Sequence, residues 1–217
     1  DGIDINYVLD KYINAIGGLD KMNNVKDISL KYQAEISGTP MKIDVTRAYK
    51  QPNLYYDITS FGNFGEMGLK YNGEICIEEG QGSKRELSEE EIQKKASSFI
   101  IFPIIHAESL NLTYELKEIE DLNGREAYKV IQKDNFDQKK TLFFDIETGY
   151  IIKEIYTENM GAMSIEVIKE HSNYSNYEGL YFPTNTTETA VMEQGSQALN
   201  LNLIEVSYES ISKDKFE

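Results

Sequence analysis

Tryptophan is absent from this chain of 217 residues, and cysteine occurs only once, as Cys76. A single cysteine cannot form a disulfide within the chain, and no spacing of cysteine and histidine indicates a metal site. A domain of this length does not need such cross-links, because it buries roughly 70% of the surface that its unfolded chain exposes. The sequence therefore predicts a core stabilised by packing, without a metal or another cofactor.

Positively charged residues are outnumbered, since 22 Lys and Arg residues stand against 37 Asp and Glu residues and give a formal net charge of -15. A body of this charge repels phosphate backbones and anionic surfaces, so we expect no nucleic acid among its partners. Long hydrophobic runs are missing too, and the chain is therefore not expected to span a membrane. The first residues, Asp1-Gly2-Ile3-Asp4, do not resemble a signal peptide.

The motifs of common enzyme classes are also missing. No nucleophile elbow, Gly-rich phosphate loop or His-Glu-x-x-His motif accompanies His106 or His171. Adjacent carboxylates are expected in so acidic a chain, and we interpret them as solvated surface. The sequence predicts no catalytic residue and no metal ligand, so the protein is predicted not to be an enzyme. A hydrolase that uses His106 as its base is the alternative.

An amphipathic helix is predicted near the start of the chain. Apolar residues recur at helical spacing from Ile5 to Ile16 and form one stripe. Asp4 is the expected N-cap, and Gly17-Gly18 predicts the end of the helix, because glycine accepts the left-handed conformation found there. We expect the stripe to pack against the strands that follow.

From Asp27 onward the apolar period changes from helical to alternating, which indicates strands with one solvated face. Asn72-Gly73 and Asn123-Gly124 predict two-residue hairpin turns, in which both positions need a positive φ. Similar runs up to Tyr208 predict about ten or eleven strands joined by short turns, and hence a meandering antiparallel sheet. No linker divides the chain, so we expect one domain, residues 1–217, of the mostly β, α+β class.

One segment, residues 88–105, interrupts the β pattern. Ser88, followed by three glutamates, predicts a capping box and a short helix. The most hydrophobic run of the chain follows, from Phe99 to Ile105, and its Pro103 is incompatible with a central strand. The run either plugs one end of the core or forms a mobile lid over a cavity for a hydrophobic ligand. Both interpretations predict burial of the run without ligand, and only the second predicts mobility.

Five motifs follow one another in an order that carries more information than any of them alone. They are Tyr49–Tyr56, Leu69–Glu74, Leu122–Val130, Phe143–Ile151 and Tyr174–Pro183. In this order they resemble the periplasmic outer-membrane lipoprotein carrier (LolA-like) family, from the first helix to about Val206. The resemblance implies a curved antiparallel sheet that forms an incomplete (half) barrel, with an N-terminal helix and a short helical lid on the concave face.

The resemblance also implies carriage of acyl chains by an exported protein of the periplasm or cell envelope, whose signal peptide has been removed. Family members often place an arginine before the proline of the first motif, where it helps to hold the lid closed. Gln51 stands at that position and cannot make charge-assisted hydrogen bonds. The identity of the ligand, the oligomeric state and a lipid anchor on a cysteine upstream of Asp1 are left open.

We accordingly predict non-catalytic binding of a hydrophobic ligand, a lipid or a lipoprotein acyl chain, in the cavity of the half-barrel, for periplasmic transport or sorting. The alternative is a periplasmic sensor or scaffold of the same fold that binds a protein partner of the envelope. The predicted wall and lid residues are Leu54, Tyr56, Phe99, Ile101, Phe102 and Ile104.

Overall fold

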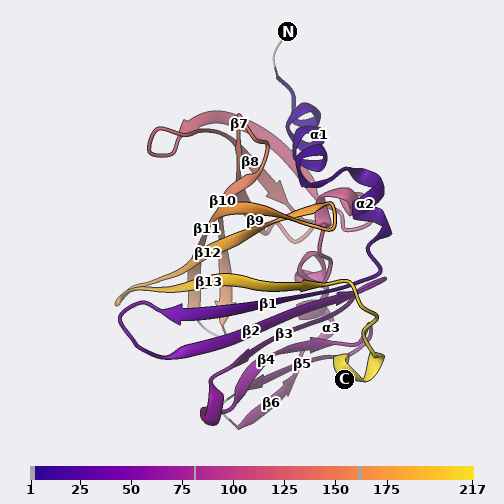
Figure 1. The fold of residues 1–217 in the computed structure, drawn as a ribbon, viewed down its shortest axis with the longest axis vertical. Coiled ribbons are helices and arrows are strands. Elements are labelled where there is room, and N and C mark those ends of the chain that lie inside the picture. The colour runs from indigo at the N-terminus through magenta and orange to yellow at the C-terminus, as the bar shows by residue number, and fades with distance from the viewer. Residues whose placement is uncertain (1–2, 81, 161–162) are drawn as a thin grey trace. The chain divides into compact units, whose positions relative to one another are not determined.

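The computed structural model describes residues 3–80, 82–160 and 163–217, and most of them lie in β-strands (Figure 1). Thirteen strands are hydrogen-bonded in the order β6-β5-β4-β3-β2-β1-β13-β12-β11-β10-β9-β8-β7. Their bounds are β1 (Asp27–Ile36), β2 (Lys42–Lys50), β3 (Leu54–Ser60), β4 (Glu66–Tyr71), β5 (Cys76–Gly80), β6 (Ser83–Glu86), β7 (Thr113–Asp121), β8 (Glu126–Lys133), β9 (Lys139–Asp145), β10 (Ile151–Met160), β11 (Met163–Tyr177), β12 (Leu180–Met192) and β13 (Gly195–Ser207).

The short helices are α1 (Ile5–Ile16), α2 (Leu19–Asn24) and α3 (Glu89–Lys95), together with the 3-10 turns η1 (Gly62–Phe64), η2 (Ala96–Phe99), η3 (Pro103–His106) and η4 (Lys213–Phe216). The mostly β, antiparallel class predicted from the alternating pattern is confirmed, but the strand count of ten or eleven is wrong. Strand β6 escaped prediction because all four of its residues are exposed, so no alternation marks it. Charged side chains such as those of Lys84 and Arg85 are common on edge strands, where they discourage pairing with other chains.

The chain divides into two compact units, each built from two separate stretches of sequence. Unit 1 comprises residues 1–23 and 104–200, and unit 2 comprises residues 24–103 and 201–217. Strand β13 is divided between them, with residues 195–200 in unit 1 and residues 201–207 in unit 2. The description of residues 1–217 as one domain stays a prediction.

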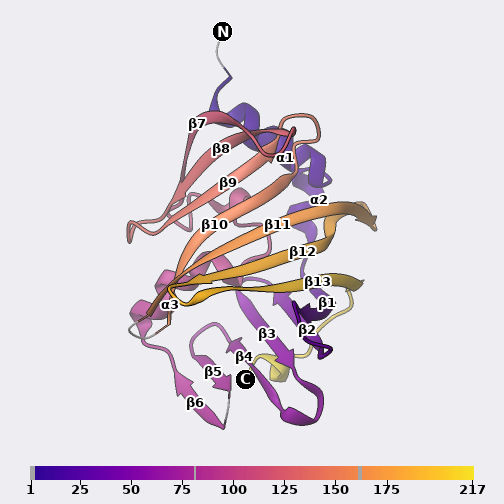
Figure 2. The same ribbon diagram turned by 90° about the vertical axis from the view of Figure 1, so that its left-hand side faces the viewer.

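Helix α1 of unit 1 begins and ends where its sequence predicts. The Asp4 carboxylate accepts a hydrogen bond from the backbone N–H of Tyr7 at 2.9 Å, and Gly17 and Gly18 have φ values of 139° and 94°. The apolar stripe packs against strands β8 and β9, and Figure 2 shows α1 behind these strands. The buried residues of this core are Val8, Ile104, Tyr128, Val130, Leu142 and Phe144.

Gly17 is expected to tolerate no side chain, because a Cβ atom there would lie 2.3 Å from the carbonyl oxygen of Gly179, in the turn between β11 and β12. Gly17→Ala should therefore lower the free energy of unfolding by about 2–5 kcal/mol, the sum of left-handed strain and overpacking. Gly18→Ala is the matched control: it has a positive φ but no atom within 4 Å of its Cβ, so only the strain of about 1–2 kcal/mol should remain. Equal losses in urea denaturation would contradict this.

The two Asn-Gly motifs form different turns. Asn123 and Gly124 both have positive φ values, 58° and 87°, and close a two-residue hairpin in which the N–H of Leu122 donates to the Arg125 carbonyl at 2.9 Å. The hairpin predicted at Asn72-Gly73 is present with a two-residue loop, but its central residues are Gly73 and Glu74, because the Asn72 N–H donates to the Ile75 carbonyl at 3.2 Å. Only Gly73 of the predicted pair has a positive φ, 100°. The Asn72 side chain accepts hydrogen bonds from the N–H groups two and three residues later, at 3.0 and 2.9 Å, and thereby stabilises the turn.

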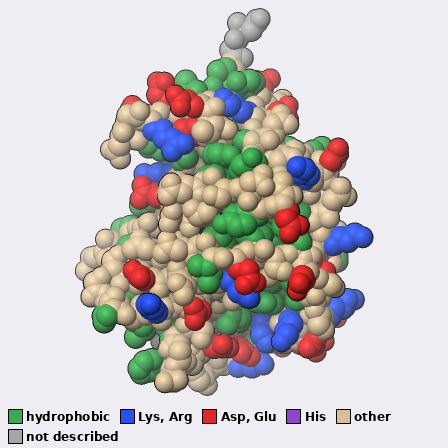
Figure 3. Space-filling model, in the orientation of Figure 1, with side chains coloured by type: hydrophobic (Ala, Val, Ile, Leu, Met, Phe, Trp, Pro, Cys, Tyr) green, Lys and Arg blue, Asp and Glu red, His purple; other side chains and the backbone are tan. Residues whose placement is uncertain are grey.

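The surface mixes charges of both signs. On the face seen in Figure 3, acidic, basic and hydrophobic side chains appear as scattered groups among the backbone and other side chains. Many of them form exposed ion pairs, such as Lys31 with Glu205 at 2.8 Å and Lys84 with Glu79 at 2.7 Å. Ion pairs of this kind contribute little to stability. The surface is therefore best understood as a solubilising one.

Candidate ligand-binding site

Three tyrosines on three neighbouring strands form the wall of the first candidate surface, in unit 2. Tyr49 of β2, Tyr55 of β3 and Tyr71 of β4 are direct cross-strand partners, and Cys76 of β5 continues the row. Directly paired residues of an antiparallel sheet share one face, so these side chains lie side by side. We call this face, with Leu87 and the Phe99 that covers it, the tyrosine face.

Phe99, in turn η2, packs directly on the tyrosine face. Its ring stacks on that of Tyr71 with centroids 4.3 Å apart and an interplanar angle of 24°, and it meets the ring of Tyr55 at 5.6 Å. Only 2% of Phe99 is exposed. Aromatic contacts of this geometry add to the hydrophobic gain of burial, so Phe99 is a strong anchor for the segment that carries it.

Helix α3, which precedes η2, has few anchors of its own. The predicted capping box is present: the Ser88 hydroxyl accepts from the N–H of Glu91, and the Glu91 carboxylate accepts from the N–H of Ser88. No residue of α3 is buried, although Ile92 packs partly against the tyrosine face. The Arg85 ion pair and the hydrogen bond from Ser88 lower the pKa of the exposed Glu91 to about 2. Residues 89–99, the α3–η2 segment, are thus held to the sheet mainly through Phe99.

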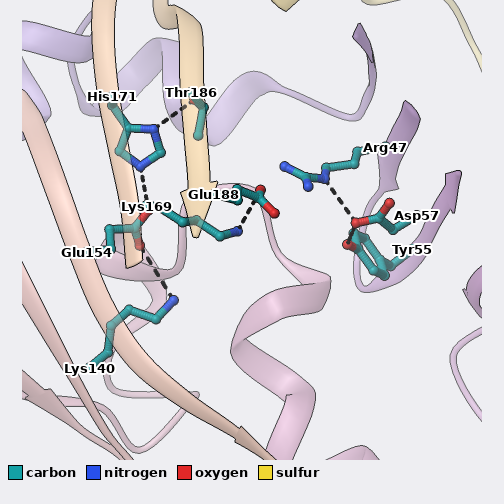
Figure 4. A network of polar contacts seen from close by, with 9 residues as sticks. All are labelled: Arg47, Tyr55, Asp57, Lys140, Glu154, Lys169, His171, Thr186 and Glu188. Carbon is teal, nitrogen blue, oxygen red and sulfur yellow. Dashed lines mark hydrogen bonds and ion pairs between the residues drawn. The ribbon is translucent and has the colours of Figure 1, made fainter. Parts of the chain in front are cut away.

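A polar group interrupts the aromatic wall in the next row of the same face. The Arg47 guanidinium donates to the Asp57 carboxylate at 2.9 Å, and the Tyr55 hydroxyl donates to the same carboxylate at 3.2 Å (Figure 4). Arg47 also lies over the Tyr32 ring, 5.4 Å from its centroid. Burial, followed by the negative charge of Asp57, holds the pKa of Tyr55 well above its ordinary value. The tyrosine face therefore combines an apolar wall with a fixed, compensated charge.

Within unit 2, the structure places the predicted ligand-binding residues on two different faces of the sheet. Phe99 covers the tyrosine face, whereas Leu54 and Tyr56 lie on the opposite face of β3 and pack against Phe216 near the C-terminus, with the Tyr56 and Phe216 rings 5.4 Å apart. Ile104 belongs to the core of unit 1, beside Val8. Phe102 is buried and Ile101 is half-buried. Burial of Phe99, Phe102 and Ile104 follows the prediction, while ligand binding by all six residues stays a prediction.

A shallow depression of about 440 Å³ lies beside the hydrophobic run, in unit 1, and is lined by Ile105, His106, Glu108 and Ser109. The Ser109 hydroxyl donates to the backbone carbonyl of His106 at 3.0 Å and not to its ring. Ser109 therefore lies near His106 in the depression, but its hydroxyl is not hydrogen-bonded to the imidazole, as an activated serine nucleophile would be.

The second candidate surface is the face of unit 1 that α1 partly covers. Cross-strand pairing places Leu142, Glu154, Lys169 and Glu188 in one row across β9 to β12. Because Leu142 belongs to the core beneath α1, the whole row lies on the helix-covered face. The row begins with a buried apolar side chain and continues with charged ones.

Polar side chains of β9 to β12 are linked to one another around Glu154 by ion pairs and hydrogen bonds. We call this group the Glu154 cluster; its members are Lys140, Glu154, Lys169, His171, Thr186 and Glu188.

His171 lies between an acid and a hydroxyl in this cluster (Figure 4). Its Nε2 atom is 2.6 Å from the Glu154 carboxylate, and its Nδ1 atom is 2.9 Å from the Thr186 hydroxyl. Burial alone raises the pKa of Glu154, but the charges of Lys140, His171 and Lys169 outweigh it and hold the pKa well below its usual range. The carboxylate is therefore ionised at neutral pH although its side chain is only 18% exposed.

Sequence reasoning missed this cluster, because His171 stands in a polar run that is typical of solvated surface. Carboxylate, imidazole and hydroxyl occur here in the order known from hydrolase triads. Thr186, however, lies inside β12 and pairs directly with His171 across the strands. A hydrolase also needs donors for an oxyanion, and the cluster's own side chains already pair with one another. Among the described residues, no three His, Cys, Asp or Glu side chains gather as possible metal ligands.

No helix in the described ranges is both long and apolar enough to cross a membrane. No protein-family model matches the sequence, and no curated protein matches it. Solved structures do match the fold. A LolA superfamily protein from Nitrosomonas europaea is 11% identical, with a TM-score of 0.64, over 100% of this chain and 98% of that chain.

Two further structures agree with that match. A DUF1329 family protein from Desulfovibrio piger is 10% identical, with a TM-score of 0.63, over 100% of this chain and 98% of that one. A domain from Vibrio parahaemolyticus, provisionally assigned to outer membrane lipoprotein sorting, is 11% identical, with a TM-score of 0.61, over 96% of this chain and 95% of that one. The chain therefore shares the fold of these three structures on a strongly divergent sequence, which confirms the predicted resemblance at the level of the fold.

Proposed function

We propose that the protein binds the hydrocarbon chain of a lipid or acylated lipoprotein on the tyrosine face of unit 2, without catalysing a reaction, in the periplasm or cell envelope. The observation that carries the proposal is the attachment of the α3–η2 segment through one aromatic side chain, Phe99, to a wall of three tyrosines. The shared fold with a LolA superfamily protein and a domain assigned to lipoprotein sorting supports it. The proposal includes the half-barrel and lid that the resemblance implies.

In this mechanism the α3–η2 segment acts as the lid. When it lifts, Phe99 leaves its place on Tyr55 and Tyr71, and a hydrocarbon chain takes over the same contacts. Each methylene removed from water contributes about 0.8 kcal/mol, so roughly ten buried methylenes reach the 8 kcal/mol or so of a micromolar complex. Reordering of the lid subtracts from this gain. Binding by burial needs no catalytic group.

The test is to purify the protein without detergent, extract it with organic solvent, and identify the extract by mass spectrometry. Delipidated protein is then titrated with a fluorescent fatty acid. We expect an extractable lipid and saturable binding with a micromolar or lower dissociation constant. Protein that is empty in every preparation and also fails to bind the fluorescent fatty acid would overturn the proposal. The envelope sensor or scaffold stays the alternative prediction, and capture of a protein partner by lipid-free protein would favour it.

A further inference from the structure

Strand β7 of unit 1 lies at one end of the hydrogen-bonded order of strands, next to β8. Along such an edge, the N–H and C=O groups of alternate residues point away from the sheet, where a strand of another chain can pair with them. Strand β7 has nine residues, whereas β6, at the other end of the order, has four, all of them exposed. Of the two edges, β7 therefore offers the longer template.

The side chains of β7 that lie on the face covered by α1 are apolar. Tyr114 and Leu116 pack against the core of unit 1. After a register shift, Ile119 pairs directly with Tyr128, a buried residue of the same core, and therefore lies on the same face. Ile119 is nevertheless 53% exposed. The apolar row thus continues along the edge to a side chain that the core leaves uncovered.

Helix α1, which contacts β7, extends this uncovered apolar surface. Its Tyr7 is 50% exposed. The hydroxyl of Tyr7 lies near that of Tyr128, whose pKa is raised first by burial and then by this neighbour. Because Tyr128 is also the cross-strand partner of Ile119, Tyr7 and Ile119 flank the same buried residue. Together they form an apolar strip beside the edge.

The opposite face of the same stretch of β7 is acidic. Glu118 and Glu120 both pair with the single ammonium group of Lys129, at 3.1 Å each, and their side chains are 63% and 40% exposed. Two carboxylates and one ammonium group leave one negative charge at this place. A strand added to β7 puts its own side chains directly beside these carboxylates, where lysine or arginine is favoured and a like charge is not.

We infer that β7 accepts an extended segment of a partner protein, which joins the sheet as a further strand and alternates apolar with basic residues. Its apolar side chains cover Ile119 and Tyr7, and its basic ones pair with Glu118 and Glu120. The backbone hydrogen bonds supply affinity, and the alternating side chains supply specificity. A second copy of this chain fits less well, because antiparallel pairing of two β7 strands sets the acidic rows beside each other. This interaction goes beyond lipid binding, and neither depends on the other.

The experiment uses the full chain, freed of lipid, and measures fluorescence anisotropy of three labelled peptides of about ten residues each. The first alternates valine with lysine, and the second alternates valine with glutamate. The third alternates proline with lysine, so it keeps the charge but lacks the N–H groups that a strand donates. We expect the Val-Lys peptide to bind about tenfold more tightly than the Pro-Lys peptide, and the Val-Glu peptide not to bind measurably. Binding of the Val-Lys peptide should slow amide hydrogen exchange in residues 113–121.

Variants locate the site. Ile119→Ser should weaken the Val-Lys peptide about fivefold, because an apolar contact is lost. Glu118→Lys combined with Glu120→Lys should reverse the preference in favour of the Val-Glu peptide. Ile204→Ser is the matched control: Ile204 is 56% exposed, but it lies on β13, which has a strand on either side, and its loss should leave the affinity unchanged.

Three results would overturn the inference. Equal affinity for the Val-Lys and Pro-Lys peptides would reduce binding to the net charge of the chain and exclude strand addition. An equal loss from Ile119→Ser and Ile204→Ser would place the peptide somewhere other than β7. Sedimentation of the protein alone as a dimer with protected β7 amides would assign the edge to a second copy. A thermal unfolding midpoint close to that of wild type establishes that each variant is compared in its folded state.

Discussion

Replacing Phe99 by alanine should lower the free energy of unfolding by about 3–5 kcal/mol, since the change removes a buried aromatic ring and leaves a cavity behind. Phe99 is 2% exposed, and its ring contacts both Tyr55 and Tyr71. Loss of the anchor should also release the α3–η2 segment, which has no other buried aromatic side chain. Amide hydrogen exchange of residues 89–99 should therefore accelerate more than that of β3 and β4.

Phe64→Ala is the matched control for this experiment, because the same side chain is removed from a position that is 84% exposed. Its effect on the free energy of unfolding should stay within about 0.5 kcal/mol. Urea denaturation of both variants measures the difference. Equal stabilities, or an exchange rate of residues 89–99 that does not respond to Phe99→Ala, would show that the segment is held by something other than this ring.

Glu154→Gln should cost about 3 kcal/mol at neutral pH, because it removes the negative charge that balances Lys140 and Lys169 in a largely buried position. An amide can still accept a hydrogen bond from His171, but it does not balance the charges around it. Glu158→Gln provides the control: Glu158 lies on the same strand and is exposed. Its replacement should leave the free energy of unfolding nearly unchanged.

The cost of Glu154→Gln should depend on pH in a defined direction. The pKa of Glu154 is lower in the folded protein than in the unfolded chain, where a glutamate titrates near about 4.3. Its contribution is therefore fully present above that value and decreases as the pH falls below it. Urea denaturation at several pH values should show wild type and Glu154→Gln converging in acid. A difference that stays constant from neutral pH to about pH 3 would contradict the charged network.

The ends of the helices could be predicted from the sequence to the exact residue. Asp4 marks the start of α1 and Gly17 its end, and Ser88 with Glu91 forms the capping box of α3. Each of these signals acts over only three or four residues. Asn123-Gly124 likewise specifies its turn through the backbone alone. The order of such signals was sufficient to indicate the fold.

The sequence could not predict which face of the sheet each side chain of β3 lies on. Leu54, Tyr55 and Tyr56 are all apolar or aromatic, so they show no alternation of polar and apolar residues that would distinguish the two faces. The outcome depends on Phe216, which covers Leu54 and Tyr56 from the far end of the chain, and on Phe99, which covers Tyr55. Knowledge of the register would have been needed to align Tyr55 with its cross-strand partners.

The Glu154 cluster was hidden for a related reason. Glu154 and His171 are 17 residues apart, on adjacent strands, and each looks like an ordinary polar residue of a solvated face. Only strand pairing brings them within 2.6 Å. A charged network on the covered face of a sheet has the same alternating pattern as a strand whose other face is wet, so periodicity could not distinguish the two.

Strand β1 has β2 on one side and β13 on the other. The first neighbour is only a short turn away, whereas the second begins at Gly195, in a distant part of the sequence. Until β13 pairs with it, β1 therefore presents an unpaired edge that no earlier part of the chain completes in the finished sheet. Such an edge can recruit strands from other molecules, and closing so distant a pair is slow. Correct folding of this protein should therefore depend on keeping β1 shielded from other chains until β13 pairs with it.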